Sequence, residues 1–336
     1  MPPPHQHAVV SLLEDCLREE CDLHDPELIC SASSGYIFRC VNYAEEQVAA
    51  KCVLLPHFLK EYKRESSMLT ALHHPSIIPL LGSYSNTTVG VLILKCAHHD
   101  LIDVLQAHSL SVLHSANIFH QICEAVQFIH NQGIAHLDIK PENILLDVTQ
   151  EHAYLADFGI ARYFTPGHQF AGKRVGTFLY CAPEILHEEP YYPVQADIWS
   201  LGIVLHVILT GTWPYSGHTE TEIYQAVQNG EVVIDVAHLT DLSYDLLRSI
   251  LCLDPNNRLS LEEILKHPWF DEAAGRHKPS SMPSLSPRNR QNVSLNHFRT
   301  SHVSIATEWI YEALRNSSEE LGLSAPRTPT RVVDSL

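Results

Sequence analysis

Short apolar runs separated by turns dominate the first third of the chain. Runs of this length, bounded by polar turn residues, are typical of β-strands. Between the second and third runs, residues 58–72 place apolar side chains at helical spacing, which suits a helix packed on a sheet. The pattern predicts a small, sheet-rich lobe with one main helix over residues 25–97. The predicted strands cover residues 36–41, 47–53, 77–81 and 89–94.

The pattern changes after Ala97, where apolar residues begin to recur every three or four positions. This spacing places them on one face of an α-helix and predicts a larger, mostly helical lobe over residues 98–270. The fold class is therefore α+β with two lobes, and the cleft between two such lobes is a usual location for a ligand site. The predicted helices cover residues 101–105, 116–130, 198–209, 220–228, 242–252 and 261–267.

Both ends of the chain differ from these lobes. Within an N-terminal extension over residues 1–24, residues 8–20 have the spacing of a short amphipathic helix. Residues 271–336 are rich in Ser, Pro, Arg and Asn, a composition that buries little apolar surface, so we expect a mostly disordered tail. Within the tail, residues 302–314 fit a helix that docks on the helical lobe, binds a partner or has no role.

Composition and charge exclude several kinds of partner. Apolar residues make up 45% of the chain, and 39 Asp and Glu against 22 Lys and Arg give a net charge of −17. Such an acidic surface repels nucleic acid and anionic lipid but attracts basic protein segments. The longest apolar stretch, over residues 201–209, is too short to cross a bilayer, and the N-terminus shows no signal-peptide pattern. We therefore expect neither nucleic acid nor a membrane as a partner.

The nine cysteines are scattered along the chain and form no CxxC pair. Neither they nor the 23 histidines show the spacing of a zinc site. The cysteines are therefore predicted to be reduced thiols, which indicates a protein of the cytoplasm, the nucleus or both.

Candidate chemistry begins with Lys51, which ends the segment VAAK on a predicted strand, and Glu65, which lies in the helix that follows. A strand lysine that is held by an acidic partner can reach the α- and β-phosphates of a nucleotide. Taken alone, each residue is more often a solvated surface side chain, so further segments have to support this interpretation.

The segment HLDIKPEN over residues 136–143 is the most informative one. Asp138 can accept the proton of an attacking hydroxyl, Lys140 can neutralise a γ-phosphate, and Asn143 offers an amide oxygen to Mg²⁺. A polar turn between a helix and a strand would not explain why these residue types follow one another in this order.

The tripeptide Asp157-Phe158-Gly159 follows a predicted strand over residues 153–156. Asp157 would hold a metal ion, and Gly159 would let the chain turn sharply. The tripeptide alone is common by chance, but fourteen residues after Asn143 it predicts a site for a metal-bound nucleotide.

Taken together, these segments resemble a eukaryotic protein kinase of the serine/threonine type, with some similarity to calcium/calmodulin-dependent and checkpoint-type kinases. The resemblance covers residues 25–270 and includes GTFLYCAPE over 176–184 and ADIWSLG over 196–202. It implies a bilobal kinase fold, ATP and Mg²⁺ as cofactors, protein substrates and a monomer. It also implies that Glu184 pairs with Arg258 and that Asp197 hydrogen-bonds the backbone of the loop bearing Asp138.

The resemblance assigns a role to each candidate site residue. Asp138, Lys140 and Asn143 would be catalytic, and Asn143 and Asp157 would be the metal ligands. An isoleucine at position 160 would favour a threonine acceptor, while Asp100 and Glu142 would favour arginine upstream of the acceptor. The residues that would bind the nucleotide are Ile29, Gly35, Ile37, Ala49, Lys51, Glu65, Cys96, Leu145 and Asp157.

Two departures from the family pattern keep an alternative open. Cys30 and Ala32 stand where the glycine-rich loop has its first two glycines, so we expect weaker ATP binding. Leu137 replaces the arginine that often anchors a phosphate on the activation segment, so we expect activity without phosphorylation of that segment. The alternative is a pseudokinase that acts as a scaffold or allosteric binding module. A small-molecule kinase of similar fold fits less well, because residues 176–184 suit a peptide substrate.

Overall fold

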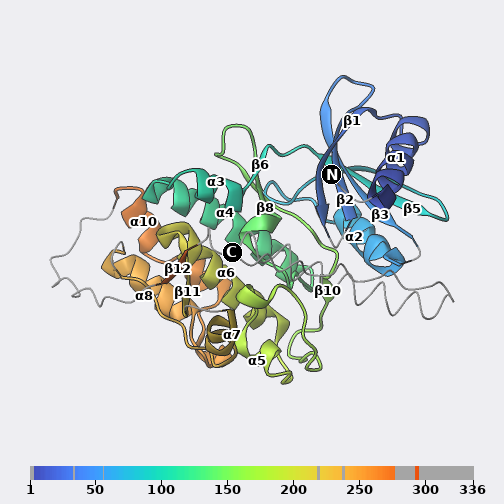
Figure 1. Ribbon diagram of the computed structural model, residues 1–336. Coiled ribbons are helices and arrows are strands. Elements are labelled where there is room, and N and C mark those ends of the chain that lie inside the picture. The colour runs from blue at the N-terminus through green and yellow to red at the C-terminus, as the bar shows by residue number, and fades with distance from the viewer. Residues whose placement is uncertain are drawn as a thin grey trace, which may run out of the picture. The chain divides into compact units, whose positions relative to one another are not determined.

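The computed structural model places an antiparallel sheet with two helices before a larger helical lobe, the bilobal α+β kinase fold that the sequence predicts (Figure 1). The predicted helix over 302–314 and nearly all of the predicted tail lie outside the described residues. The structure describes residues 4–32, 35–55, 57–217, 220–236, 239–276 and 292–294.

The N-terminal lobe is built on a five-stranded antiparallel sheet with the strand order β1-β2-β3-β5-β4. Residues that alternate along β2 and β3 point to opposite faces, which gives the sheet a face toward α2 and a face toward α1. The strands are β1 (His24–Ala32), β2 (Gly35–Val41), β3 (Gln47–Leu54), β4 (Leu80–Ser85) and β5 (Val89–Lys95).

The strand predicted near 77–81 is displaced in the structure, where β4 starts only at Leu80. Ile77 and Ile78 are 1% exposed, and Ile77 forms an isolated bridge with Leu155 of the helical lobe. Their apolar character therefore reflects burial beside a C-lobe strand rather than a place in the sheet. Strand β1 was not predicted, because its side chains show no regular alternation of buried and exposed positions.

Two helices cover the sheet. Helix α2 (Leu59–Ala71) packs on one face through buried side chains that include Tyr62, Met68 and Leu69. Helix α1 (Pro4–Glu19), predicted over 8–20, packs through Leu13 and Leu17 on the other face.

The larger lobe packs around helix α6 (Pro193–Thr210), which includes the whole of the helix predicted over 198–209. Among the described helices, α6 is the one long and apolar enough to cross a bilayer, although 78% of it is buried inside the protein. That burial is typical of a core helix. The stretch expected to be too short to span a membrane is thus part of an 18-residue helix.

The five other predicted helices of this lobe agree with the structure to within a few residues, whereas α5 and α10 were not predicted. The largest difference is at α4, which starts at Val112 rather than at 116, because Ser111 caps it by accepting a hydrogen bond from the His114 N–H. The helices are α3 (Leu101–Ala107), α4 (Val112–Asn131), α5 (Pro183–Leu186), α7 (Glu220–Gln228), α8 (Asp241–Ile250), α9 (Leu261–Leu265) and α10 (Trp269–Ala273).

Short strands and single helical turns carry the loops that hold the candidate site. Strand β8 pairs with both β6 and β9, β7 pairs with β10, and β11 pairs with β12. Helix α10 and strand β12 both extend into the stretch after Phe270. The strands are β6 (His99–Asp100), β7 (Ile134–Ala135), β8 (Ile144–Leu146), β9 (Ala153–Leu155), β10 (Arg162–Tyr163), β11 (Thr212–Ser216) and β12 (Asn292–Ser294), and the 3₁₀ turns are η1 (Pro141–Asn143), η2 (Phe178–Tyr180) and η3 (Pro255–Asn257).

Candidate active site

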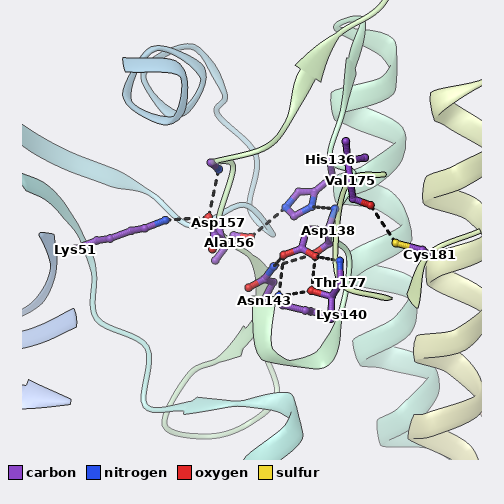
Figure 2. Close-up of polar contacts among 11 residues, drawn as sticks. Lys51, His136, Asp138, Lys140, Asn143, Ala156, Asp157, Val175, Thr177 and Cys181 are labelled. Carbon is purple, nitrogen blue, oxygen red and sulfur yellow. Dashed lines mark hydrogen bonds and ion pairs between the residues drawn. The ribbon is translucent and has the colours of Figure 1, made fainter. Parts of the chain in front are cut away.

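Lys51 joins the two lobes at the candidate site. Its Nζ donates to Glu65 Oε1 and Oε2 of α2 at 2.8 and 2.7 Å. It also donates to Asp157 Oδ1 (Figure 2), at 2.8 Å. Burial alone would lower the pKa of Lys51, but the two carboxylates outweigh burial and raise that pKa. Burial would likewise raise the pKa of Asp157, yet the charge of Lys51 lowers it to about 2. Lys51 and Asp157 are therefore both charged at neutral pH.

Asp138 lies at the centre of a second cluster, and both of its carboxylate oxygens accept hydrogen bonds (Figure 2). Oδ2 accepts from Lys140 Nζ at 2.8 Å and from Asn143 Nδ2 at 3.0 Å. Oδ1 accepts from the backbone N–H and the hydroxyl of Thr177 at 2.8 and 2.7 Å. Lys140 also donates to the Thr177 hydroxyl at 2.7 Å. The loop over residues 136–143, the catalytic loop, and the stretch over residues 159–182, the activation segment, therefore meet at this carboxylate.

The backbone of the catalytic loop is held by Asp197 of α6, whose side chain is fully buried. Its Oδ2 accepts from the His136 N–H at 2.8 Å, and its Oδ1 accepts from the Leu137 N–H at 2.7 Å. This confirms the contact that the resemblance implied. His130 Nε2 lies 2.8 Å from the same carboxylate, a neighbour that the sequence pattern did not indicate.

Leu137 has a strained backbone and lies close to Gly176. Leu137 has a φ of 66°, a left-handed conformation that costs a non-glycine residue roughly 1–2 kcal/mol. A Cβ at Gly176 would lie 2.3 Å from the Leu137 carbonyl oxygen, so this position requires glycine. Leu137 is itself 5% exposed, which shows that an apolar side chain fills the place of the family's arginine.

Asp157 and its neighbours link the metal-binding candidate to α2. Asp157 has a φ of 62°, and its Oδ1 accepts from the Gly159 N–H at 3.2 Å. Phe158 is fully buried and packs edge-on against His136 at 4.9 Å between ring centroids. Arg64 of α2 donates to the Gly159 carbonyl at 3.0 Å, a contact that the sequence reasoning missed.

The oxygen donors near Asp138 fit Mg²⁺. Asn143 uses its Nδ2 for both contacts with Asp138, at 2.8 and 3.0 Å, so its amide oxygen can face a metal. The N–H of Ala156, the residue before Asp157, donates to the Asn143 carbonyl at 2.9 Å, so the chain leads from this cluster directly into Asp157. Within the described part of the chain, no group of three or more His, Cys, Asp or Glu side chains could hold a metal ion. Phosphate oxygens and water would therefore supply the remaining ligands, as is usual for Mg²⁺.

The remaining nucleotide-binding candidates lie on strands of the two lobes. Ile37 pairs with Lys51 across β2 and β3, and alternation places Ala49 on the same face as both. Cys96 directly follows β5 and is 9% exposed. Leu145 lies on β8, opposite Asp100. Ile29, by contrast, is 49% exposed at a register shift in β1, so it is less enclosed than the other candidates.

Gly35 marks the altered phosphate-binding turn. Its φ is 135°, and a Cβ there would lie 2.3 Å from the Cys52 carbonyl oxygen of β3. Cys30 pairs with Ile37 and Ala32 pairs with Gly35 across β1 and β2. The one family glycine that remains is thus the one that the close approach of β3 requires.

Backbone and side-chain contacts anchor the activation segment on the helical lobe. Phe170 and Tyr191 exchange two backbone hydrogen bonds of 2.8 and 3.2 Å, and their rings meet edge-on at 5.8 Å. Cys181 donates from Sγ to the Val175 carbonyl at 3.0 Å. Farther along the chain, Glu184 forms the predicted buried pair with Arg258 through two hydrogen bonds of 2.7 and 2.9 Å.

Comparisons with known proteins agree with this geometry. A model of the protein kinase domain matches residues 23–270. The chain is 34% identical over 231 residues to a probable serine/threonine-protein kinase MARK-A of Dictyostelium discoideum, covering 67% of this chain and 22% of that protein. It is 28% identical over 292 residues to calcium-dependent protein kinase 29 of Arabidopsis thaliana, covering 83% and 54%. It is 33% identical over 253 residues to death-associated protein kinase 2 of Mus musculus, covering 73% and 66%.

The chain thus spans less than two thirds of the length of each of these three relatives. The matched region includes both lobes and every candidate site residue. This chain belongs to the protein kinase family, and within that family it resembles the serine/threonine kinases of the calcium/calmodulin-dependent type.

Proposed function

We propose that the chain is an active kinase that transfers the γ-phosphate of ATP to a serine or threonine hydroxyl of a protein substrate. The observation that carries the proposal is the meeting of two clusters: Lys51 with Asp157, and Asp138 with Lys140 and Asn143 (Figure 2). An ammonium, a proton acceptor and two oxygen donors for a metal are the groups that phosphoryl transfer requires.

Each residue has a distinct task in this reaction. Lys51, oriented by Glu65, binds the α- and β-phosphates of ATP. Asp138 orients the substrate hydroxyl and accepts its proton, while Lys140 stabilises the negative charge of the transferred phosphoryl group. Bound Mg²⁺, held by Asp157 and Asn143, would neutralise phosphate charge.

The same geometry disfavours the pseudokinase alternative. The Leu137 N–H is held by Asp197 and its side chain is buried, and the altered turn keeps the glycine that β3 requires at position 35. Neither departure removes a group that touches the phosphates, the metal or the substrate hydroxyl. We therefore expect a lower affinity for ATP rather than a loss of transfer.

We further propose that activity does not require phosphorylation of the activation segment. Leu137 cannot donate a charge-assisted hydrogen bond to a phosphate. The backbone bridge between Phe170 and Tyr191 and the ion pair between Arg174 and Glu188, at 3.6 Å, support this proposal, because they anchor the segment by other means.

We also propose a preference for basic residues upstream of a threonine acceptor. Glu142 Oε2 is buried without a hydrogen-bond partner in the described structure, and burial raises the pKa of Glu142 although Lys140 is near. A substrate guanidinium would pair with the Glu142 carboxylate when that side chain turns toward the substrate. Asp100 at the start of α3 would add negative charge, and Ile160 supports threonine as the acceptor. We expect a monomer in the cytoplasm, the nucleus or both.

The test is transfer of labelled phosphate from ATP in the presence of Mg²⁺. Wild type should phosphorylate an arginine-containing peptide, and Asp138→Ala should lose at least about 100-fold in kcat. Asp271→Ala is the matched control, because that carboxylate is 61% exposed and far from the site in sequence. Binding of ATP by wild type without transfer to any protein or peptide would show a pseudokinase instead.

A further inference from the structure

Helix α1 precedes the region that matches the kinase domain, which begins at residue 23. It is nevertheless a buried part of the N-terminal lobe. Leu13 and Leu17 of α1 are 0% exposed, and Leu23, just after the helix, is 2% exposed. These three side chains share one hydrophobic core with Phe38 of β2 and Val91 of β5. Helix α1 therefore forms a core of its own with the sheet.

This core lies behind the face of the sheet that carries the nucleotide site. Ala50 and Cys52 of β3 belong to the core under α1, whereas Lys51 between them reaches Glu65 on the other face. In β2, Phe38 faces α1, while its neighbour Ile37 is the cross-strand partner of Lys51. The strand residues assigned to the nucleotide thus alternate with residues that pack under α1.

The side chains of strand β1 are little buried, so the strand is held by its backbone pairing with β2 and by its connection to α1. Leu28 and Ile29 of β1 are 37% and 49% exposed. The start of the strand is fixed from the helix, since the Leu23 N–H donates to the Leu17 carbonyl at 3.0 Å. Strand β1 then leads directly into the phosphate-binding turn, where two of the family's glycines are missing.

We propose that α1 is a positioning element for ATP, whose docking through Leu13 and Leu17 holds β1 and β2 so that the altered turn covers the phosphates. The inference rests on the proposed nucleotide site. A turn with fewer glycines adapts less freely to a ligand, so its position has to be set beforehand. Undocking of α1 should weaken ATP binding and leave the catalytic loop, which is held by Asp197, unchanged.

The test uses neighbouring leucines of the same helix. Leu13→Asp and Leu17→Asp place a carboxylate in the core and should undock α1, whereas Leu12→Asp is the matched control because Leu12 is 46% exposed. We expect KM for ATP to rise about tenfold in the first two variants, with kcat and KM for the peptide nearly unchanged. A role in stability alone would lower kcat through loss of active protein and leave KM for ATP unchanged, which would overturn the proposal.

Alkylation of cysteines reports whether α1 has undocked. Cys40 and Cys52 lie in the core under α1 and are 1% and 0% exposed, and Cys123 of α4 in the other lobe is also 0% exposed. Undocking should let iodoacetamide label Cys40 and Cys52 but not Cys123, whereas global unfolding labels all three. If the aspartate variants unfold globally, Leu13→Ala and Leu17→Ala take their place, because they weaken the packing of α1 without burying a charge. In either series, labelling of Cys40 and Cys52 without a change in ATP affinity would overturn the proposal.

Equilibrium binding separates this inference from the proposed function. Calorimetric titration with ATP and Mg²⁺ measures affinity whether or not phosphate is transferred. Equal affinity in the Leu12→Asp and Leu13→Asp proteins, with α1 undocked only in the second, refutes the positioning role and leaves the kinase proposal standing. A wild type that binds ATP but transfers nothing refutes the kinase proposal, while the comparison of affinities still decides the role of α1.

Discussion

Lys51 and Asp157 are joined by an ion pair of 2.8 Å although 106 residues separate them in the chain. Lys51 comes from a strand of the N-terminal lobe, and Asp157 follows a strand of the helical lobe. Because Glu65 holds the same ammonium, one cation orders carboxylates from both lobes. The two halves of the proposed ATP site are therefore linked through Lys51.

Replacing Lys51 by methionine should remove this alignment and the contact with the phosphates. We expect kcat/KM for peptide phosphorylation to fall by at least about 100-fold. Thermal unfolding should also occur at a lower temperature, because Glu65 loses the partner of its buried charge. Lys60→Met on the exposed side of α2 is the control and should behave as wild type. Retained transfer in Lys51→Met would contradict the assignment.

Restoring glycine at positions 30 and 32 should lower KM for ATP. Neither Cys30 nor Ala32 has a positive φ, so the gain comes from the loss of their side chains, which lets the turn backbone approach the phosphates more closely. Steady-state kinetics of the Cys30→Gly/Ala32→Gly protein measure the effect. Ala44→Gly, in the exposed turn between β2 and β3, removes a methyl group as Ala32→Gly does, but far from the altered turn in sequence, and should change nothing. The explanation of the altered turn fails if KM is the same in all three proteins.

Thr165→Ala should keep the activity of wild type, and so should protein treated with a phosphatase. Thr165 is exposed, and the segment that carries it is already anchored through Phe170 and Tyr191. Thr177→Ala is the informative contrast, because its hydroxyl contacts both Asp138 and Lys140 at 2.7 Å and its loss should lower kcat. Inactivation by phosphatase that maps to Thr165 would show that a phosphate is needed.

Arg258→Met should destabilise the helical lobe by about 3–5 kcal/mol, because it leaves the buried charge of Glu184 without its partner. The Arg258 guanidinium also donates to the Gln195 carbonyl at 2.9 Å and lies 4.9 Å from the Trp199 ring centroid. Urea unfolding followed by tryptophan fluorescence measures the loss. Arg248→Met is the control, since that side chain is 67% exposed. A similar midpoint for both variants would show that the pair contributes little.

Stability should fall as the pH drops from 6.5 towards 4, partly because of His206. Burial lowers the pKa of His206 to about 4, and the imidazole is held neutral between the Thr212 carbonyl and the Asp235 N–H. The unfolded chain binds the proton at higher pH, so this side chain accounts for about 3 kcal/mol of stability that is complete above pH 6.5 and lost near pH 4.

Denaturant titrations at a series of pH values test this assignment. His206→Gln should flatten the pH dependence between 6.5 and 4, whereas His168→Gln, which alters an exposed imidazole, should leave it unchanged. If wild type and His206→Gln lose stability in parallel over that range, other groups cause the effect.

The spacing of chemical motifs anticipated the site better than the hydrophobic pattern anticipated the sheet. Lys51, Glu65 and Asp157 meet as expected, because strand, helix and loop contexts restrict where each can lie. The position of β4 was predicted wrongly because Ile77 and Ile78 are apolar. Burial against another lobe and burial within a sheet produce the same local pattern.

Contacts that depend on tertiary structure could not be predicted from local sequence. Helical periodicity indicated a helix near the N-terminus but not the face of the sheet that it covers. Likewise, Arg64 and His130 show no motif of their own, and only the folded chain brings them to the Gly159 carbonyl and to Asp197.

Asp197 has a consequence for the order in which the molecule can be assembled. The peptide units of His136 and Leu137 take their orientation from a carboxylate that lies 61 and 60 positions further along the chain. A nascent polypeptide that ends before α6 would already contain the complete HLDIKPEN sequence but not the group that sets its backbone. Catalytic competence should therefore arise late in synthesis, only after α6 has emerged and packed.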